Sequence, residues 1–191
     1  MGLTGGIGAG KSTALAALEE LGAAVLSTDQ VVHDLYESEE VRAAVVARFG
    51  PEVAPDGRVD RGALATRAFA TDEDRHWLEG LLWPRVGERM VSWRAELERR
   101  SPAPRAAVVE VPLLFESGMD HGFDATIAVV APEDVRAERA AGRGHHAVDE
   151  RAARQLTQQE KAQRATYVVD NDGDIDALRA KLSSVLEMLS R

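Results

Sequence analysis

A glycine-rich stretch near the start of the chain restricts the possible folds more than any other feature. Residues 5–12 have the spacing G-x-x-x-x-G-K-[ST], and the stretch reads GGIGAGKST from Gly5 to Thr13. Glycines allow successive backbone N–H groups to turn inward and form a concave anion-binding surface that a Cβ would obstruct. Lys11 adds a cation for the terminal phosphates, and the Ser12 hydroxyl is a suitable ligand for Mg²⁺. The motif therefore predicts a loop that binds the phosphates of a nucleotide.

The residues on either side of the loop predict a strand before it and a helix after it. Residues 2–4 could end a strand, and residues 11–21 carry leucines at positions 15, 18 and 21 before Gly22, where a helix can stop. The N-terminus of this helix would direct its partial positive charge at the phosphates.

Four further segments indicate strands, and helical patterns separate them. The expected strands are Ala23–Leu26, Ala106–Val111, Thr126–Val130 and Tyr167–Asp170. With the first strand they make five, and helical crossovers between strands are typical of a parallel sheet. We therefore predict an α/β fold with a five-stranded parallel sheet. The expected helices cover residues 11–21, 31–36, 41–49, 61–69, 73–82, 84–100, 132–141, 149–163 and 175–189.

Two regions are expected to serve the loop from outside the sheet, within a single domain over residues 1–191. Residues 30–105 contain no convincing strand and exceed a simple crossover, so we interpret them as an inserted helical subdomain that binds the acceptor. Pro84 is expected to interrupt its fourth helix or to begin a fifth. Residues 142–158 start with a glycine-hinged basic stretch around Arg143, which suits a lid.

The composition excludes several classes of partner. The chain has 23 basic and 32 acidic residues and a net charge of −9, which repels nucleic acid. No apolar run approaches the length of a membrane span. The absence of cysteine excludes disulfides and suits the cytoplasm. We expect a cytoplasmic protein with a small-molecule substrate, without a nucleic-acid or membrane partner, and either monomeric or a weak homo-oligomer.

Among loop-containing nucleotide-binding proteins, the sequence favours a small-molecule kinase. A GTP switch would need an N-K-x-D element, and no stretch qualifies. A kinase needs a phosphate cradle, an acceptor pocket, a group near the acceptor hydroxyl and arginines for the transferring phosphate. Asp29 follows the second strand at the edge of the sheet where ligands bind, although it could equally cap the next helix. Arg139 and Arg143 could supply the arginines, and Glu110 is a weak candidate for a Walker B acid.

Several segments together resemble the dephospho-coenzyme A kinase family. These segments are residues 2–13, V-P-L-L-F-E at 111–116, the Gln155…Glu160-Lys161 segment, and V-D-N at 169–171. The resemblance implies a P-loop kinase core with a helical insert and a lid. It also implies transfer of the ATP γ-phosphate to the ribose 3′-hydroxyl of dephospho-coenzyme A, the last step of coenzyme A synthesis.

The resemblance assigns roles to residues at matching positions. It implies catalytic roles for Asp29, Lys11, Arg139 and Arg143, with Asp29 as general base or acceptor-orienting group. Mg²⁺ would be held by Ser12 together with the nucleotide oxygens. The expected ATP-binding residues are Gly6, Ile7, Gly8, Ala9, Gly10, Lys11, Ser12 and Thr13.

Three positions depart from the family pattern and keep other functions open. Ser27 stands where the family often has a second acid, His33 where an Arg often follows, and Trp83 replaces the His of an L-H-P element. These departures affect the acceptor more than the ATP half of the reaction. The alternatives are another small-molecule kinase, shikimate-like or acting on nucleosides, and a non-catalytic ATP-binding module.

Overall fold

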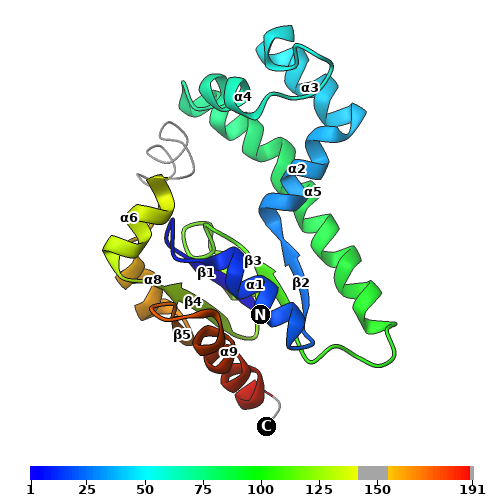
Figure 1. The fold of residues 1–191 in the computed structure, drawn as a ribbon. Coiled ribbons are helices and arrows are strands. Elements are labelled where there is room, and N and C mark those ends of the chain that lie inside the picture. Colours follow the sequence, from blue (N-terminus) through cyan, green and yellow to red (C-terminus); the bar gives the residue numbers. More distant parts are fainter. Residues whose placement is uncertain (142–154, 190–191) are drawn as a thin grey trace. The chain divides into compact units, whose positions relative to one another are not determined.

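The computed structural model describes residues 1–141 and 155–189 (Figure 1). The chain divides into two compact units. Met1–Ser27 and Glu96–Arg191 form the first, here called the sheet unit, and Thr28–Ala95 form the second, here called the helical unit. Each unit has its own hydrophobic core.

The sheet unit contains the five-stranded parallel sheet that the sequence predicts. The strands are β1 (Gly2–Gly5), β2 (Ala24–Ser27), β3 (Ala107–Glu110), β4 (Thr126–Val130) and β5 (Tyr167–Asp170). Their order is β2-β3-β1-β4-β5, and every neighbouring pair is parallel. The fold class is therefore confirmed, with β1 at the centre of the sheet.

The strand order places the glycine-rich loop at the carboxyl end of the central strand, β1. Leu3 of β1 is in register with Glu110 of β3, and Gly5 is in register with Val129 of β4. After β1 the chain crosses to β2, at one edge of the sheet. After β3 it crosses in the other direction, past β1, to β4. Ligands of open parallel sheets bind where the connections change direction, at the carboxyl ends of the strands. The loop that follows Gly5 emerges at this position.

Helices cover both faces of the sheet. On one face, α1 (Lys11–Glu20) and α9 (Ile175–Leu189) lie side by side (Figure 1). On the other face lies α8 (Gln158–Arg164), whose Lys161 contacts Thr4. Among its described residues, this unit also contains α6 (Glu133–Ala141) and a short 3₁₀ helix at Met119–Gly122. The core between the sheet and the α1–α9 pair includes Leu3, Leu15, Leu18, Ile127, Val129, Leu178 and Leu182.

The helical unit packs four helices around an apolar core of its own. They are α2 (Thr28–Glu37), α3 (Glu39–Phe49), α4 (Arg61–Ala68) and α5 (Asp72–Glu98), whose last residues extend into the sheet unit. A 3₁₀ turn, Pro51–Val53, follows α3. The core is formed by Val41, Val45, Val53, Leu64, Ala68, Leu78 and Leu82.

An aromatic and charged cluster joins α3 to α5 at the edge of this core. The rings of Phe49 and Trp77 meet edge to face with centroids 5.4 Å apart, and the Arg48 guanidinium lies 5.9 Å from the Trp77 centroid. Arg48 also pairs with Glu73 at 2.8 Å and with Asp74 at 2.7 Å. Its hydrogen bond lowers the pKa of the Asp74 carboxyl. Both helices are therefore held by packing and by charge.

The expected break at Pro84 is absent from α5, which runs unbroken from Asp72 to Glu98. A proline inside a helix removes one N–H donor and crowds the carbonyl four residues earlier. That carbonyl belongs to Gly80, which has no side chain. In the same turn, Arg85 Nη1 donates to the Leu81 carbonyl at 2.6 Å. This additional donor supports the turn that Pro84 weakens.

The helix expected over residues 149–163 starts later in the described part of the chain. Residues 149–154 lie outside the described residues, and α8 begins at Gln158 with Thr157 as its N-cap. Thr157 and Glu160 form a capping box, in which each side chain binds the backbone N–H of the other residue. The Thr157 hydroxyl also donates to the Glu160 carboxylate at 2.8 Å, and this hydrogen bond, together with that from the Thr157 N–H, lowers the pKa of the Glu160 carboxyl. The expected start at Asp149 lies outside the described residues, but residues 155–157 are not helical, so the expected helix is not continuous up to α8.

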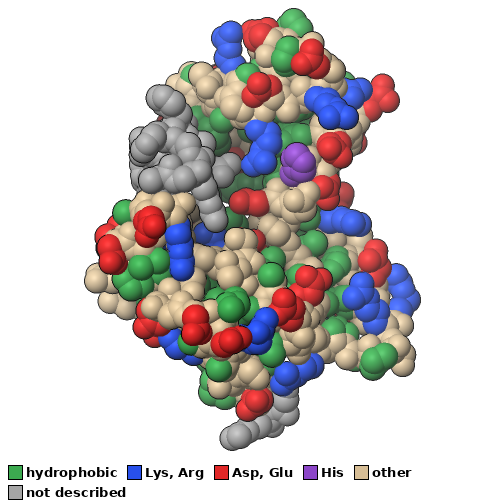
Figure 2. Space-filling model, viewed as in Figure 1, with side chains coloured by type: hydrophobic (Ala, Val, Ile, Leu, Met, Phe, Trp, Pro, Cys, Tyr) green, Lys and Arg blue, Asp and Glu red, His purple; other side chains and the backbone are tan. Residues whose placement is uncertain are grey.

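The surface carries charges of both signs. Figure 2 shows Lys and Arg side chains interspersed with Asp and Glu on the face in view. Among the described residues, no helix combines the length and the apolar character that crossing a membrane requires.

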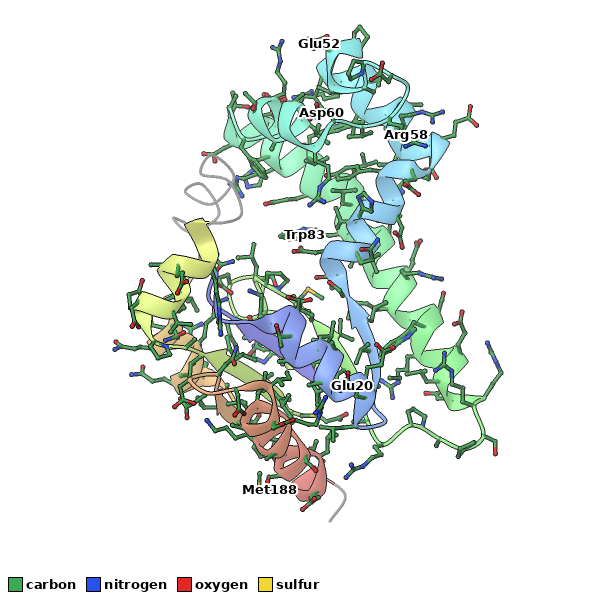
Figure 3. All side chains as sticks on the ribbon, viewed as in Figure 1. Glu20, Glu52, Arg58, Asp60, Trp83 and Met188 are labelled. Atoms are coloured by element: carbon green, nitrogen blue, oxygen red, sulfur yellow. The ribbon has the colours of Figure 1, made fainter. Side chains whose placement is uncertain are left out.

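The N-cap of α4 offers a test of local stability. Asp60, labelled in Figure 3, accepts hydrogen bonds from the backbone N–H groups of Gly62 and Ala63 at 2.8 and 3.0 Å. Asp60→Ala removes both and should lower the free energy of unfolding by about 1 kcal/mol, measured by urea denaturation. Asp56→Ala, at an exposed turn position, is the matched control and should change it little. Equal losses in both variants would contradict the capping role.

Candidate phosphate-binding site

The loop between β1 and α1 has a backbone that only glycine supports at two positions. Gly8 has φ +77° and Gly10 has φ +90°, in the left-handed region that side chains rarely adopt. A Cβ on Gly8 would lie 2.4 Å from the Arg136 carbonyl oxygen, and one on Gly10 would lie 2.1 Å from Asn171 Nδ2. Both glycines are therefore required by conformation and by space.

Lys11 and the first turn of α1 give this loop a positive character. Lys11 Nζ donates to the carbonyls of Gly5 and Gly6 at 3.1 and 3.2 Å, so its ammonium lies over the loop. The first turn of α1 carries no acidic residue that would offset the partial positive charge of the helix N-terminus. Ser12 and Thr13 lie exposed in that turn. The arrangement suits a polyanion.

Arg136 of α6 supports the outer side of the loop. Its Nε donates to the Ile7 carbonyl at 3.0 Å, and its Nη1 pairs with Glu133 at 2.5 Å. Together with Gly6 and Ile7 it lines a cavity of about 480 Å³ that extends to Gln158 at the start of α8. No motif in the sequence predicts a role for Arg136. Its spacing of three residues from Arg139 was an available signal, because i and i+3 side chains share a helix face.

Arg139 is the predicted catalytic arginine that the structure places beside the loop. Its Nη1 lies 3.5 Å from the position that a Cβ on Gly10 would occupy, and the residue is exposed. Its catalytic role stays a prediction. Arg143 lies outside the described residues, as does most of the expected lid.

Asn171, which follows β5, contacts the loop from another direction. Its backbone N–H donates to the Val130 carbonyl at 2.7 Å, and its side-chain Nδ2 donates to the Ala9 carbonyl at 2.9 Å. The residue is 5% exposed. In the sequence, Asn171 was part of the family resemblance but received no role, since a contact 162 residues apart leaves no local signal.

Asp29 lies in the first turn of α2, at the start of the helical unit. It does not form the N-cap, because the helix already includes Thr28, and its side chain is exposed. Ser27, two residues before Asp29, ends β2 in register with Glu110 of β3. The role of Asp29 toward an acceptor stays a prediction.

The loop fits a divalent cation only in company with a nucleotide. Among the described residues, no group of three or more His, Cys, Asp or Glu side chains could hold a metal ion. The exposed Ser12 hydroxyl in the first turn of α1 is one hard oxygen ligand. Mg²⁺ commonly takes most of its ligands from substrate phosphates and water, and such an ion is compatible with this donor set.

Two side chains of α8 attach this helix to the strands that carry the loop. The Gln158 amide exchanges two hydrogen bonds with the backbone of Ala131, each of 2.9 Å. Lys161 is fully buried, and its Nζ lies 2.8 Å from Glu116 Oε1 and 2.6 Å from the Pro112 carbonyl. Burial lowers the pKa of Lys161, and the Glu116 carboxylate opposes this shift.

The same buried pair connects several segments of the chain. Lys161 Nζ also reaches Thr4 Oγ1 at 3.4 Å, one residue before the loop begins. Glu116 Oε1 in turn accepts the backbone N–H of Leu156 at 2.8 Å. Segments 111–116 and 155–161, which the sequence analysis singled out separately, therefore meet under β1.

Comparisons with known proteins found a matching family model and similar sequences. Residues 1–177 match the family model described as CoaE, dephospho-CoA kinase. The chain is 40% identical over 192 residues to the dephospho-CoA kinase of Deinococcus radiodurans, covering 99% of this chain and 91% of that protein. It is 39% identical over 196 residues to that of Moorella thermoacetica, covering 100% and 92%.

Two solved structures share the fold. A crystal structure of a Thermus thermophilus protein superposes with a TM-score of 0.78 at 36% identity, covering 98% of this chain and 96% of that one. A dephospho-CoA kinase from Campylobacter jejuni superposes with a TM-score of 0.62 at 20% identity, with the same coverage, which supports the fold alone.

The buried Lys161–Glu116 pair predicts a large effect on stability. Lys161→Met leaves the Glu116 carboxylate without its cation and should lower the free energy of unfolding by about 3 kcal/mol, measured by denaturant titration. Adding Glu116→Gln should restore part of that loss, because no buried charge then remains. Lys181→Met is the control, since Lys181 pairs with Asp172 at the surface and should contribute less than about 1 kcal/mol. Similar losses in the two lysine variants would contradict the buried pair's importance.

Proposed function

This chain belongs to the dephospho-CoA kinase family, and from that premise we propose how its residues act in the reaction. The reaction is transfer of the γ-phosphate of ATP to the ribose 3′-hydroxyl of dephospho-coenzyme A, the final step of coenzyme A synthesis. The observation that carries the proposal is the loop from Gly5 to Thr13, complete in sequence and held at positive φ at Gly8 and Gly10.

The loop residues Gly6 to Thr13 hold the phosphates of ATP. Backbone N–H groups of the loop, apart from that of Ala9, which donates to the Gly6 carbonyl at 3.2 Å, act as fixed donors together with the N-terminus of α1. Such donors need no reorganisation when charge moves during transfer. The Lys11 ammonium, which lies over the loop through its contacts with the Gly5 and Gly6 carbonyls, binds the terminal phosphates. Mg²⁺, when bound, neutralises phosphate charge, and Ser12 would hold it together with nucleotide oxygens.

Asp29 orients the acceptor hydroxyl and receives its proton late in the transfer. Phosphoryl transfer with a loose transition state needs little activation of the nucleophile, so positioning contributes more than basicity. The location of Asp29 directly after β2 supports this role, because β2 ends at the sheet edge from which the loop also emerges.

Arg139 and Arg143 stabilise the charge on the transferring phosphoryl group. Arg139 is the better supported of the two, since its exposed guanidinium lies beside Gly10. Arg136 is a supporting residue instead, because Ile7 and Glu133 already engage its guanidinium. Of the two arginines on α6, Arg136 therefore supports the loop and Arg139 contacts the phosphoryl group.

The helical unit provides the acceptor site, and residues 142–158 provide a lid. Three side chains of the helical unit bear on acceptor choice. Trp83 is 54% exposed on α5, as labelled in Figure 3, and His33 is exposed on α2. Arg85 pairs with Glu40 and binds the Leu81 carbonyl, which leaves it less suited to replace the cation missing at His33.

A cytoplasmic location and a monomeric or weakly associated state belong to the same proposal.

A substrate panel tests the reaction directly. With ATP and Mg²⁺, we expect ADP release that depends on dephospho-coenzyme A and exceeds the blank without acceptor. Shikimate and nucleosides should give no more ADP than the blank. Phosphorylation of either of them, with dephospho-coenzyme A inert, would contradict the proposal.

Asp29→Asn separates the chemical step from nucleotide binding. The variant keeps the size of the side chain but replaces a carboxylate that only accepts hydrogen bonds with an amide that also donates. The acceptor hydroxyl loses both its orienting partner and its proton acceptor, so kcat should fall by about 10²-fold or more. Its Kd for ATP should stay within about twofold of wild type, because the phosphate loop is untouched. Asp34→Asn, also exposed on α2, is the control and should keep wild-type kcat. An unchanged kcat in Asp29→Asn would reject the role of Asp29.

A further inference from the structure

We propose that Asn171 is a positioning residue for ATP binding that acts through the peptide group between Ala9 and Gly10. The inference rests on the proposed function, in which the loop holds the ATP phosphates. Asn171 does not belong to the loop, and it would not touch the nucleotide to exert this effect.

The backbone of Asn171 is fixed by the sheet. It follows directly on β5, and its N–H donates to the Val130 carbonyl at the end of β4 at 2.7 Å. Because β4 pairs with β1 from Thr126 to Val129, directly before Val130, this hydrogen bond sets the position of Asn171 relative to the strand that leads into the loop. The residue is 5% exposed, so its side chain has little freedom.

The side chain of Asn171 reaches the loop with a single directed hydrogen bond. Its Nδ2 donates to the Ala9 carbonyl at 2.9 Å. The same nitrogen lies only 2.1 Å from the position that a Cβ on Gly10 would occupy. The amide therefore fills the space beside Gly10 and holds the carbonyl that precedes it.

This contact determines the direction of the next donor. In a trans peptide group, the C=O and the N–H point in opposite directions. The Ala9 carbonyl and the Gly10 N–H belong to one such group, so a carbonyl held by Asn171 turns the Gly10 N–H away from Asn171. Gly10, at φ +90°, is flexible in the absence of such a tie. Asn171 thereby pre-orients a donor for a phosphate on the opposite side of the loop.

A purely structural role in the turn after β5 is less consistent with the contacts. That turn has ties of its own, because Lys181 Nζ binds the Asp170 carbonyl and the Asp172 carboxylate, each at 2.8 Å. The start of α9 is capped by Asp174, which accepts the Ala177 N–H at 2.8 Å. The Asn171 amide is directed at the loop instead.

The test compares ATP affinity with stability in two variants. Asn171→Leu keeps the number of side-chain heavy atoms but removes the donor, and Asn171→Ala removes both bulk and donor. In each variant the Kd for ATP, measured by titration calorimetry, should rise about tenfold, as expected for one lost buried hydrogen bond. The KM for ATP should rise in parallel. The KM for dephospho-coenzyme A should stay within about twofold of wild type, which a general loss of structure would not allow.

Asp172→Ala is the matched control in the same turn. It removes the tie to Lys181 without touching the loop, and its Kd for ATP should equal that of wild type. The thermal unfolding temperature of every variant without nucleotide shows whether a change in affinity merely follows a change in stability.

Two results would overturn the inference. One is ATP affinity in Asn171→Leu and Asn171→Ala within twofold of wild type, and the other is an equal loss of affinity in Asp172→Ala. Both leave the proposed function intact, because wild type still binds ATP. A wild-type chain that does not bind ATP would instead reject the proposed function, and the role of Asn171 with it.

Discussion

The phosphate loop depends on holding its carbonyl groups away from the surface that faces the ligand. A loop whose N–H groups turn inward must find donors for its carbonyls, since unpaired buried backbone groups are costly. The structure supplies them at five positions. Lys11 binds the carbonyls of Gly5 and Gly6, Arg136 binds that of Ile7, Asn171 binds that of Ala9, and the Ala14 N–H binds that of Gly10. The rest of the sheet unit can be understood as the support for these donors.

The parallel sheet brings the distant donors to the loop. β4 lies beside β1, so the helix that follows β4 delivers Arg136 to Ile7, and β5 lies next, so its end delivers Asn171 to Ala9. On the opposite face, the buried Lys161 of α8 contacts Thr4 and pairs with Glu116. Glu116 in turn accepts the Leu156 N–H just before α8. A loop of flexible glycines thus gains a defined shape from elements more than a hundred residues away.

Much of this arrangement could be predicted from the sequence, and the remainder has physical reasons for escaping it. Apolar runs and a complete loop motif sufficed for the five parallel strands and for the site around Lys11, because both are local patterns. α5 continues through Pro84, where the Arg85 side chain adds a hydrogen bond to the Leu81 carbonyl, and the helix-breaking preference of proline alone gave the wrong prediction. The start of α8 was readable from Thr157 and Glu160. The contacts of Arg136 and Asn171 are long-range. The spacing of Arg136 from Arg139 indicates a shared helix face, but no local pattern identifies Ile7 or Ala9 as the partners of these side chains.

The central claim is that inward-facing backbone amides of the loop bind the nucleotide through its phosphates. The most direct test follows the backbone amide resonances of Gly8, Gly10 and Lys11 by NMR during titration with ATP and, separately, with adenosine. The account predicts that ATP shifts these resonances strongly and that adenosine, which lacks phosphates, leaves them in place. Binding of ATP that leaves all three unchanged would contradict it.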